Sequence, residues 1–152
     1  MVVNGIASIL HRDTIAVIVG ARTFERGEQC FTAKRVLEVE AGRGELRGKV
    51  KPSEGGRRDY VCRIWLHEDG VAYECTCPIG IARQFCKHAV AIALAHLANE
   101  RVEAERGLGV LREALSHLTQ PLLVEGLLQM AKRDQEVADN LKRMCLEQLS
   151  KT

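Results

Sequence analysis

One short stretch constrains this sequence more than any other, because three cysteines and a histidine fall within fourteen positions. The stretch reads CTCPIGIARQFCKH and has the pattern Cys-x-Cys-x8-Cys-x-His. Two cysteines at i and i+2 of an extended strand point to the same side, so both sulfur atoms can reach one ion. Thiolate sulfur and imidazole nitrogen are the ligands that structural zinc sites use. The spacing therefore predicts one structural Zn²⁺ bound by Cys75, Cys77, Cys86 and His88.

The second half of this pattern also constrains where a helix begins. Two residues lie about 200° apart around a helix axis, so Cys86 and His88 cannot face one ion from the interior of a straight helix. We expect Cys86 at or just before a helix start, with His88 in the first turn of a helix that continues to Ala98. The positive end of that helix and the adjacent Lys87 favour the thiolate form of Cys86.

Other chemistries of the four residues are less well supported by the spacing. An iron–sulfur cluster can use three cysteines and a histidine, but tight C-x-C and C-x-H pairs suit a single ion better. A redox-active C-x-C pair is a further alternative. A catalytic zinc ion needs an open coordination position, which four protein ligands do not leave. His96 is the substitute ligand if His88 is not used.

The expected redox compartment bears on all six cysteines. The N-terminal stretch MVVNGIASILH lacks the basic region and cleavage site of a secretory signal, and no run approaches the roughly 18 apolar residues of a membrane span. We therefore expect a cytoplasmic protein, or a nuclear one in a eukaryote, in which thiols bind metal or pack rather than form disulfides. Cys30, Cys62 and Cys145 are expected to be buried as small hydrophobic residues.

The pattern of apolar residues predicts an α+β fold: a small antiparallel sheet with a ββα zinc finger, followed by a C-terminal helical hairpin. VLEVEAGRGELRGKV predicts two strands joined by a glycine-containing turn. Residues 60–66 and 71–74 predict a second hairpin around the turn Asp69–Gly70. TFERGEQCF favours a short helix with Thr23 as its N-cap. The first twenty residues fit either a strand or a short helix capped by Asp13, and both alternatives stay open.

The domain organisation follows from a change in composition near residue 100. Residues 1–100 are predicted to form a zinc-binding domain with its core at 59–98, and residues 101–152 a helical extension. Pro121 and Asp134 are helix-start signals within the extension. One helical stripe contains Val137, Leu141, Met144 and Cys145. Amphipathic stripes usually face a core, so packing on the chain's own domain is favoured over a partner surface.

The ligand pattern, with the following AVAIALAHL, resembles the SWIM zinc finger, whose signature is C-x-C-x(n)-C-x-H. RTFERGEQCFTAKRV is similar to the F-x-R-G-x-x-Y-F helix and strand that precede the finger in prokaryotic members, with Cys30 where an aromatic residue is usual. LVEGLLQMAKRDQEV resembles the helix pair that follows it, with Gln135 in place of the usual proline. The resemblance implies a ββα zinc fold that binds DNA or other proteins.

Basic residues are concentrated in one segment, although the net charge is only +2. Residues 42–58, GRGELRGKVKPSEGGRR, carry six Lys or Arg against two Glu. Such a run is either a solvated loop or a surface for phosphates. The outward Trp65 either covers the sheet or stacks on a base. The candidate nucleic-acid contacts are Arg47, Lys49, Lys51, Arg57, Arg58, Arg83 and Lys87.

Two functions of different classes follow from these observations. The first is a nucleic-acid-binding module, with DNA as the expected partner, in which zinc holds the ββα unit rigid. The second is a protein-interaction adaptor in which the helices between Leu108 and Leu149 contact a partner. No G-x-S-x-G, P-loop or dinucleotide motif occurs, so we expect neither enzymatic activity nor a small-molecule substrate. We also expect no membrane partner.

Overall fold

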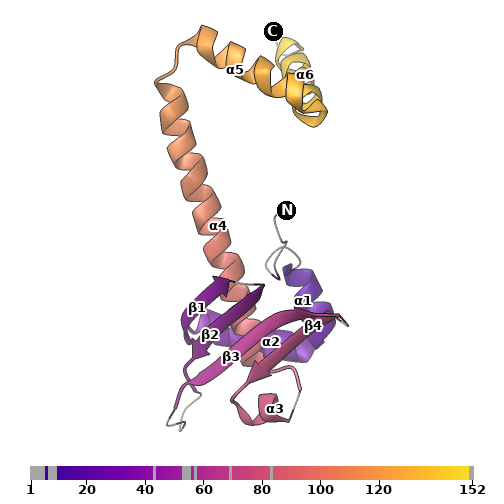
Figure 1. Ribbon diagram of the computed structural model, residues 1–152, viewed down its shortest axis with the longest axis vertical. Coiled ribbons are helices and arrows are strands. Elements are labelled where there is room, and N and C mark those ends of the chain that lie inside the picture. The colour runs from indigo at the N-terminus through magenta and orange to yellow at the C-terminus, as the bar shows by residue number, and fades with distance from the viewer. Residues whose placement is uncertain are drawn as a thin grey trace. The chain divides into compact units, whose positions relative to one another are not determined.

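The computed structural model describes residues 6, 10–42, 44–52, 56, 58–68, 70–82 and 84–150. It confirms the α+β class: a four-stranded antiparallel sheet with helices, several of them C-terminal (Figure 1). The elements in chain order are α1 (Arg12–Val19), α2 (Ala21–Thr32), β1 (Val36–Gly42), β2 (Glu45–Val50), β3 (Tyr60–His67), β4 (Gly70–Cys75), α3 (Pro78–Ile81), α4 (Lys87–Ser116), α5 (Gln120–Arg133) and α6 (Gln135–Leu149). The chain divides into two compact units, Met1–Glu103 and Ala104–Thr152.

The sheet has the strand order β1-β2-β3-β4, so each strand pairs with its neighbour in the sequence. Side chains alternate between the two faces because the strand period is two residues. Along β2, Leu46 and Val50 are buried while Arg47 and Lys49 point outward and are exposed. Both predicted hairpins are present. Asp69, which was expected in the second turn, lies outside the described residues.

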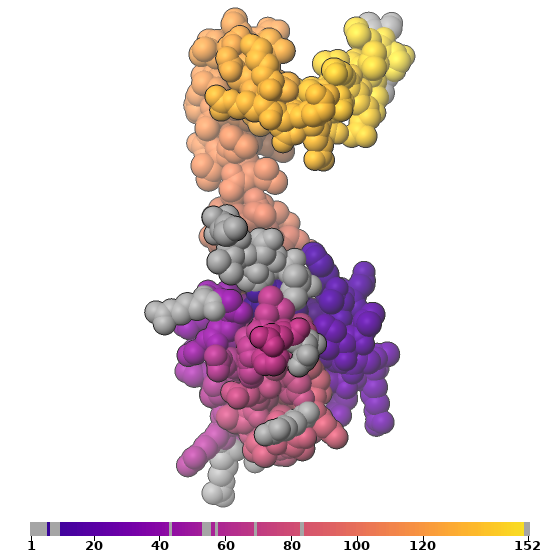
Figure 2. Space-filling view, turned by 45° about the vertical axis from the view of Figure 1, so that its right-hand side comes forward, coloured from indigo at the N-terminus to yellow at the C-terminus, as the bar shows by residue number. Residues whose placement is uncertain are grey.

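The core of the N-terminal unit forms between the sheet and the first turns of α4. Every residue of Ala89–Ala95 is buried, as expected for a helical segment that is apolar all round. In Figure 1 the sheet lies in front of α2 and of these turns, and in the space-filling view of Figure 2 the indigo helices α1 and α2 form one side of the unit. Close approach requires glycine at two points: Gly27 of α2 contacts Val90, and Gly48 of β2 contacts Ile92.

The Gly27 contact leads to a stability prediction. The Cβ atom of an alanine at this position would lie 2.3 Å from Val90 Cγ1, which is far inside van der Waals contact. Because overpacking a core usually costs about 1–3 kcal/mol, Gly27→Ala should lower the free energy of unfolding by that amount in a urea titration. Gly107→Ala is the matched control, since no heavy atom lies within 4 Å of its added Cβ. Equal unfolding midpoints for both variants would contradict the close packing of α2 on α4.

Three expectations about helices are corrected. Thr23 is not the N-cap of α2, because that helix begins at Ala21 and Gly20, at φ 78°, forms its cap. The helix predicted to end at Ala98 is too short, since α4 runs from Lys87 to Ser116. Glycines 107 and 109 lie within it because helix interiors tolerate glycine at about 1 kcal/mol each. Of the two alternatives for the start of the chain, residues 12–19 form a helix, α1, but its N-cap is His11 and not Asp13, which lies in the first turn.

The C-terminal unit, taken by itself, contains the end of α4 followed by α5 and α6, and the last two pack against each other. As predicted, Asp134 caps α6: its carboxylate accepts hydrogen bonds from the backbone N–H groups of Glu136 and Val137. Within 104–150 the structure describes every residue, and none is buried. Cys145 is exposed, so the expectation that it is buried is wrong. Across the described part of the chain, the helices lack either the length or the apolar content to cross a bilayer.

Candidate metal centre

Three elements of the N-terminal unit deliver the four predicted ligands. Cys75 ends β4, and Cys77 is the N-cap of the short helix α3, where its sulfur accepts a hydrogen bond from the Gly80 N–H at 3.2 Å. After α3 the chain returns so that Cys86 immediately precedes α4. His88 is the second residue of that helix. The expected relation between Cys86, His88 and the helix start is therefore confirmed.

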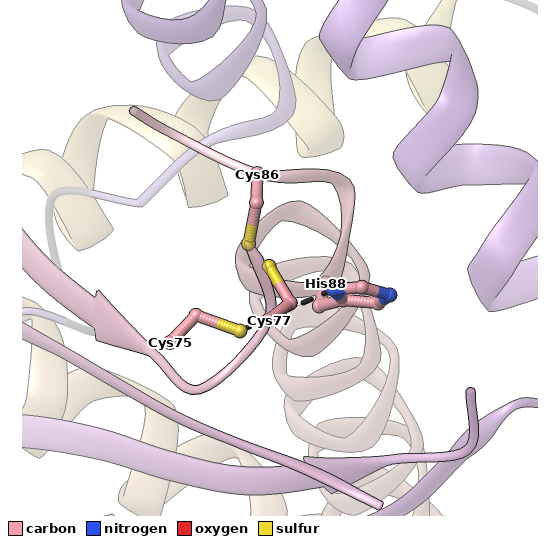
Figure 3. Close-up of side chains that lie close together, drawn as sticks. All are labelled: Cys75, Cys77, Cys86 and His88. Atoms are coloured by element: carbon pink, nitrogen blue, oxygen red, sulfur yellow. Dashed lines mark hydrogen bonds between the residues drawn. The ribbon is translucent and has the colours of Figure 1, made fainter. Parts of the chain in front are cut away.

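The four ligand atoms converge on one point. The Sγ atoms of the cysteines and the imidazole nitrogen all lie within 4.8 Å of one another, and all four residues are buried. Figure 3 shows the three sulfur atoms gathered beside the His88 ring, with Cys75 Sγ 4.0 Å from His88 Nδ1. Tetrahedral ligands at about 2.3 Å from an ion would lie about 3.8 Å apart. The donor set and its spacing are thus suitable for one metal ion.

The surroundings of the cluster favour a thiolate at Cys86. Hydrogen bonds from the thiols of Cys62 and Cys75 lower the pKa of Cys86 far below its ordinary value, against the opposing effect of burial. Metal ligation requires this deprotonated form. Burial is the largest cause that raises the pKa of Cys77, and the hydrogen bond from Gly80 opposes it. A buried thiolate at Cys86, close to the ligand sulfurs of Cys75 and Cys77, is suited to a cation.

Residues around the ligands fix the shape of the site. A Cβ atom at Gly80 would lie 2.5 Å from the carbonyl oxygen of Cys75, so α3 can fold back only with glycine there. The centre of the Tyr60 ring lies 4.6 Å from the centre of the His88 ring. A fifth sulfur, that of Cys62, lies 2.9 Å from Cys75 Sγ. Strand alternation predicted that Cys62 is buried, but only the pairing of β3 with β4 shows which cysteine it contacts.

The candidate nucleic-acid contacts do not gather in one place among the described residues. Arg47 pairs with Glu45, and Lys49 Nζ lies 2.9 Å from Glu38. Lys51 follows β2, Arg58 is exposed in a bend, and Lys87 is half-buried at the start of α4. Arg57 and Arg83 lie outside the described residues.

The outward face of the sheet, on which Arg47 and Lys49 lie, is not strongly basic. The Arg63 guanidinium pairs with Glu45 and lies 4.8 Å from the centre of the Trp65 ring. By strand alternation, the charged residues facing outward from the paired strands are Glu38, Glu40, Glu45, Arg47, Lys49, Arg63 and Glu74. Acidic residues on this face outnumber basic ones, so the face is a poor electrostatic match for phosphates.

A different set of basic residues meets at a hollow of about 290 Å³, which we call the basic hollow. The residues that line it are Arg26, Gln29, Cys30, Ala33, Arg35 and Lys87. Three cations from three parts of the chain are present, and no carboxylate is among these lining residues. Burial raises the pKa of Cys30, and the charges of Lys87 and Arg35 oppose that rise. Sequence analysis identified only Lys87, because the other two cations lie some fifty to sixty positions away.

The turn beside the basic hollow has an unusual residue. Arg35 N–H bonds to Cys30 O and Lys34 N–H bonds to Phe31 O, which is the Schellman pattern for ending a helix. Its left-handed position is normally glycine, but here Lys34 occupies it at φ 52°. The chain therefore carries a cation where glycine would be less strained.

Comparisons of this chain with protein-family models, with curated proteins and with solved structures find no match.

Proposed function

We propose that this protein is a non-enzymatic, SWIM-type binding module in which one structural zinc ion fixes the N-terminal unit and the basic hollow binds the phosphate backbone of DNA. Three thiolates and one imidazole form a donor set that suits Zn²⁺. Four protein ligands leave no open position for a reacting water, which favours a structural role.

The observation that carries the DNA proposal is the meeting of three cations without a carboxylate in the basic hollow. Lys87 lies between the ligands Cys86 and His88 in the sequence, so a bound metal ion would hold it in place. Arg35 is oriented by a hydrogen bond from its guanidinium to the carbonyl oxygen of Pro52 at 3.3 Å. Arg26 is exposed at the rim and is free to turn toward a ligand. Phosphates provide most of the affinity in non-specific DNA binding, and such clusters of Arg and Lys bind them.

A fluorescence anisotropy titration of labelled duplex DNA tests this proposal. Arg26→Gln should weaken binding and reduce the slope of log affinity against log salt by about 0.9, which corresponds to one phosphate contact. Arg47→Gln is the matched control: it removes an arginine that pairs with Glu45 on the outward face of the sheet, and it should leave the slope unchanged. Binding that is absent, insensitive to salt, or reduced equally by both variants would reject the basic hollow as the contact surface.

A second candidate function, a protein-interaction adaptor, is favoured by the C-terminal unit. Within 104–150, where no residue is buried, large apolar side chains are exposed on all three helices and in the bend between α4 and α5. These are Leu108, Val110, Leu111, Leu115, Leu118, Leu122, Val124, Leu127, Leu128, Met130, Met144, Leu146 and Leu149. An apolar surface of this kind marks a protein contact.

The occupant that best fits this surface is a second copy of the same chain, bound through α4. Ala104, Leu108, Leu111 and Leu115 are spaced 4, 3 and 4 residues apart, which is the a/d repeat of a coiled coil. We call these four residues the α4 seam. When two such helices cross antiparallel about the midpoint of the seam, Glu105 of each copy faces Arg112 of the other. A parallel pairing instead brings Glu100 near Glu105, so charge favours the antiparallel form.

A further inference from the structure

The fifth buried sulfur of the metal centre has a fixed partner. Cys62 of β3 and Cys75 of β4 are direct partners in the register of the two strands. Opposed residues of an antiparallel pair have Cα atoms about 4.5–5.5 Å apart, which is within the range of about 4.4–6.8 Å that a disulfide spans. The two Sγ atoms are 2.9 Å apart, and the Cys62 thiol donates a hydrogen bond to Cys75 Sγ. Both strands are therefore already placed for a bond between these atoms.

A hollow beside this pair offers a small oxidant a route of approach, although both side chains are buried. A hollow of about 860 Å³ opens along β3 and β4, and Cys62 and Cys75 both line it, together with Tyr73, Thr76 and Gly80. Peroxide is little larger than water and fits such a space. Of the two other buried ligand cysteines, Cys77 and Cys86, neither is among the residues that line this hollow.

From this geometry we propose that Cys62 and Cys75 form an oxidative modification site, in which peroxide converts the two thiols to a cross-strand disulfide and removes Cys75 from the metal centre. Formation of the disulfide requires only the pairing of β3 with β4 and the approach of peroxide through the hollow along these strands. The accompanying metal release rests on the proposed zinc site.

The reaction balances with hydrogen peroxide as the oxidant. The sulfur of Cys75 attacks one peroxide oxygen, the O–O bond breaks, and the departing hydroxide takes the proton lost from Cys75 to become water. The sulfur of Cys62 then attacks the sulfenic acid on Cys75, the S–O bond breaks, and the Cys62 proton leaves with the hydroxyl as a second water. Two sulfurs lose one electron each, and one peroxide is reduced to two waters.

Loss of Cys75 changes the metal centre in a defined way. Cys77, Cys86 and His88 remain, and three ligands hold a structural ion much less tightly than a closed set of four. The hairpin of β3 and β4 is preserved, because the new bond joins residues that already oppose each other. Oxidation therefore loosens the segment from α3 to the start of α4 rather than the whole sheet.

Peptide mapping after peroxide treatment tests the proposal on the full-length, metal-loaded chain. The exposed Cys145 is replaced by serine to prevent links between chains. Trypsin places these cysteines on three peptides. Cys62 lies in DYVCR, Cys75 and Cys77 lie in IWLHEDGVAYECTCPIGIAR, and Cys86 lies in QFCK. We expect the DYVCR peptide linked to the longer peptide, with fragmentation placing the link at Cys75. We also expect release of one metal ion in parallel, followed with a chromogenic chelator, and reversal of both by dithiothreitol and added zinc.

Substitutions of Cys62 show whether its thiol reacts with Cys75 or only packs in the core. Cys62→Ala and Cys62→Ser should both abolish the link and slow metal release several-fold, and Cys30→Ser, which removes a buried thiol outside the ligand set, should change neither. A link between Cys75 and Cys77 or between Cys77 and Cys86, or equal metal release from Cys62→Ala and the unsubstituted chain, would overturn the proposal. If the purified chain holds no metal, the zinc proposal fails, and the mapped peptide alone decides on the disulfide.

Discussion

Removal of the metal ion, by a chelator or by Cys86→Ser, is expected to abolish the fixed structure of residues 60–97. The four ligands join the end of β4, the start of α3 and the start of α4, and the same turns of α4 form the core of the unit. Structural zinc contributes apparent binding free energies on the order of 10–16 kcal/mol. The free energy of unfolding of a whole domain is about 5–15 kcal/mol. Loss of the metal ion therefore removes a contribution as large as the total stability of the unit.

Metal analysis together with circular dichroism measures this effect. The purified chain should contain one zinc ion, and Cys86→Ser should contain none. The near-ultraviolet signal of the aromatic residues packed around the site, among them Tyr60 and Tyr73, should collapse in the variant and after chelation. Cys30→Ser serves as control, because Cys30 is buried but is not one of the four clustered ligands. Unchanged near-ultraviolet spectra after chelation would contradict a structural role for the metal.

The cluster of Cys75, Cys77, Cys86 and His88 and the sheet were predictable because their signals are local. The C-x-C and C-x-H pairs lie within fourteen positions, and helix geometry alone required Cys86 to precede the helix and His88 to enter it. Cys62, which lies in the predicted strand at residues 60–66, was likewise expected to be buried, and it is.

What could not be predicted depends on contacts between distant segments. The basic hollow combines Arg26, Arg35 and Lys87, which come together only when α2 packs on α4 through Gly27. The pairing of Cys62 with Cys75 depends on strand register, which their separation of thirteen positions does not specify.

The extent of α4 was underestimated for another reason. The composition changes near Asn99 from apolar to charged, and this change was taken as the end of a helix, whereas it marks the point where α4 leaves the core. The expectation that the C-terminal stripe is buried failed at Met144 and Cys145, which are both exposed.

The α4 seam leads to the second large prediction, on self-association. Leu111→Glu should convert a concentration-dependent dimer to a monomer in sedimentation experiments. Placing an unpaired carboxylate at the centre of the seam costs about 3 kcal/mol, which weakens association on the order of 100-fold. Val110→Glu is the matched control, because Val110 is 66% exposed on the same helix but lies one residue off the seam. Equal loss of association in both variants, or a wild-type chain that is monomeric at all concentrations, would reject the seam.

A charge exchange then distinguishes the antiparallel pairing from any other. Glu105→Arg places like charges opposite each other at both ends of an antiparallel seam, since Arg112 of the other copy faces that position. The double variant Glu105→Arg with Arg112→Glu restores opposite charges and should recover the wild-type dissociation constant. In a parallel pair the two positions do not face each other, so the second substitution would give no recovery. Because each copy carries both halves of the charge pair, recovery would identify the partner of α4 as α4 itself.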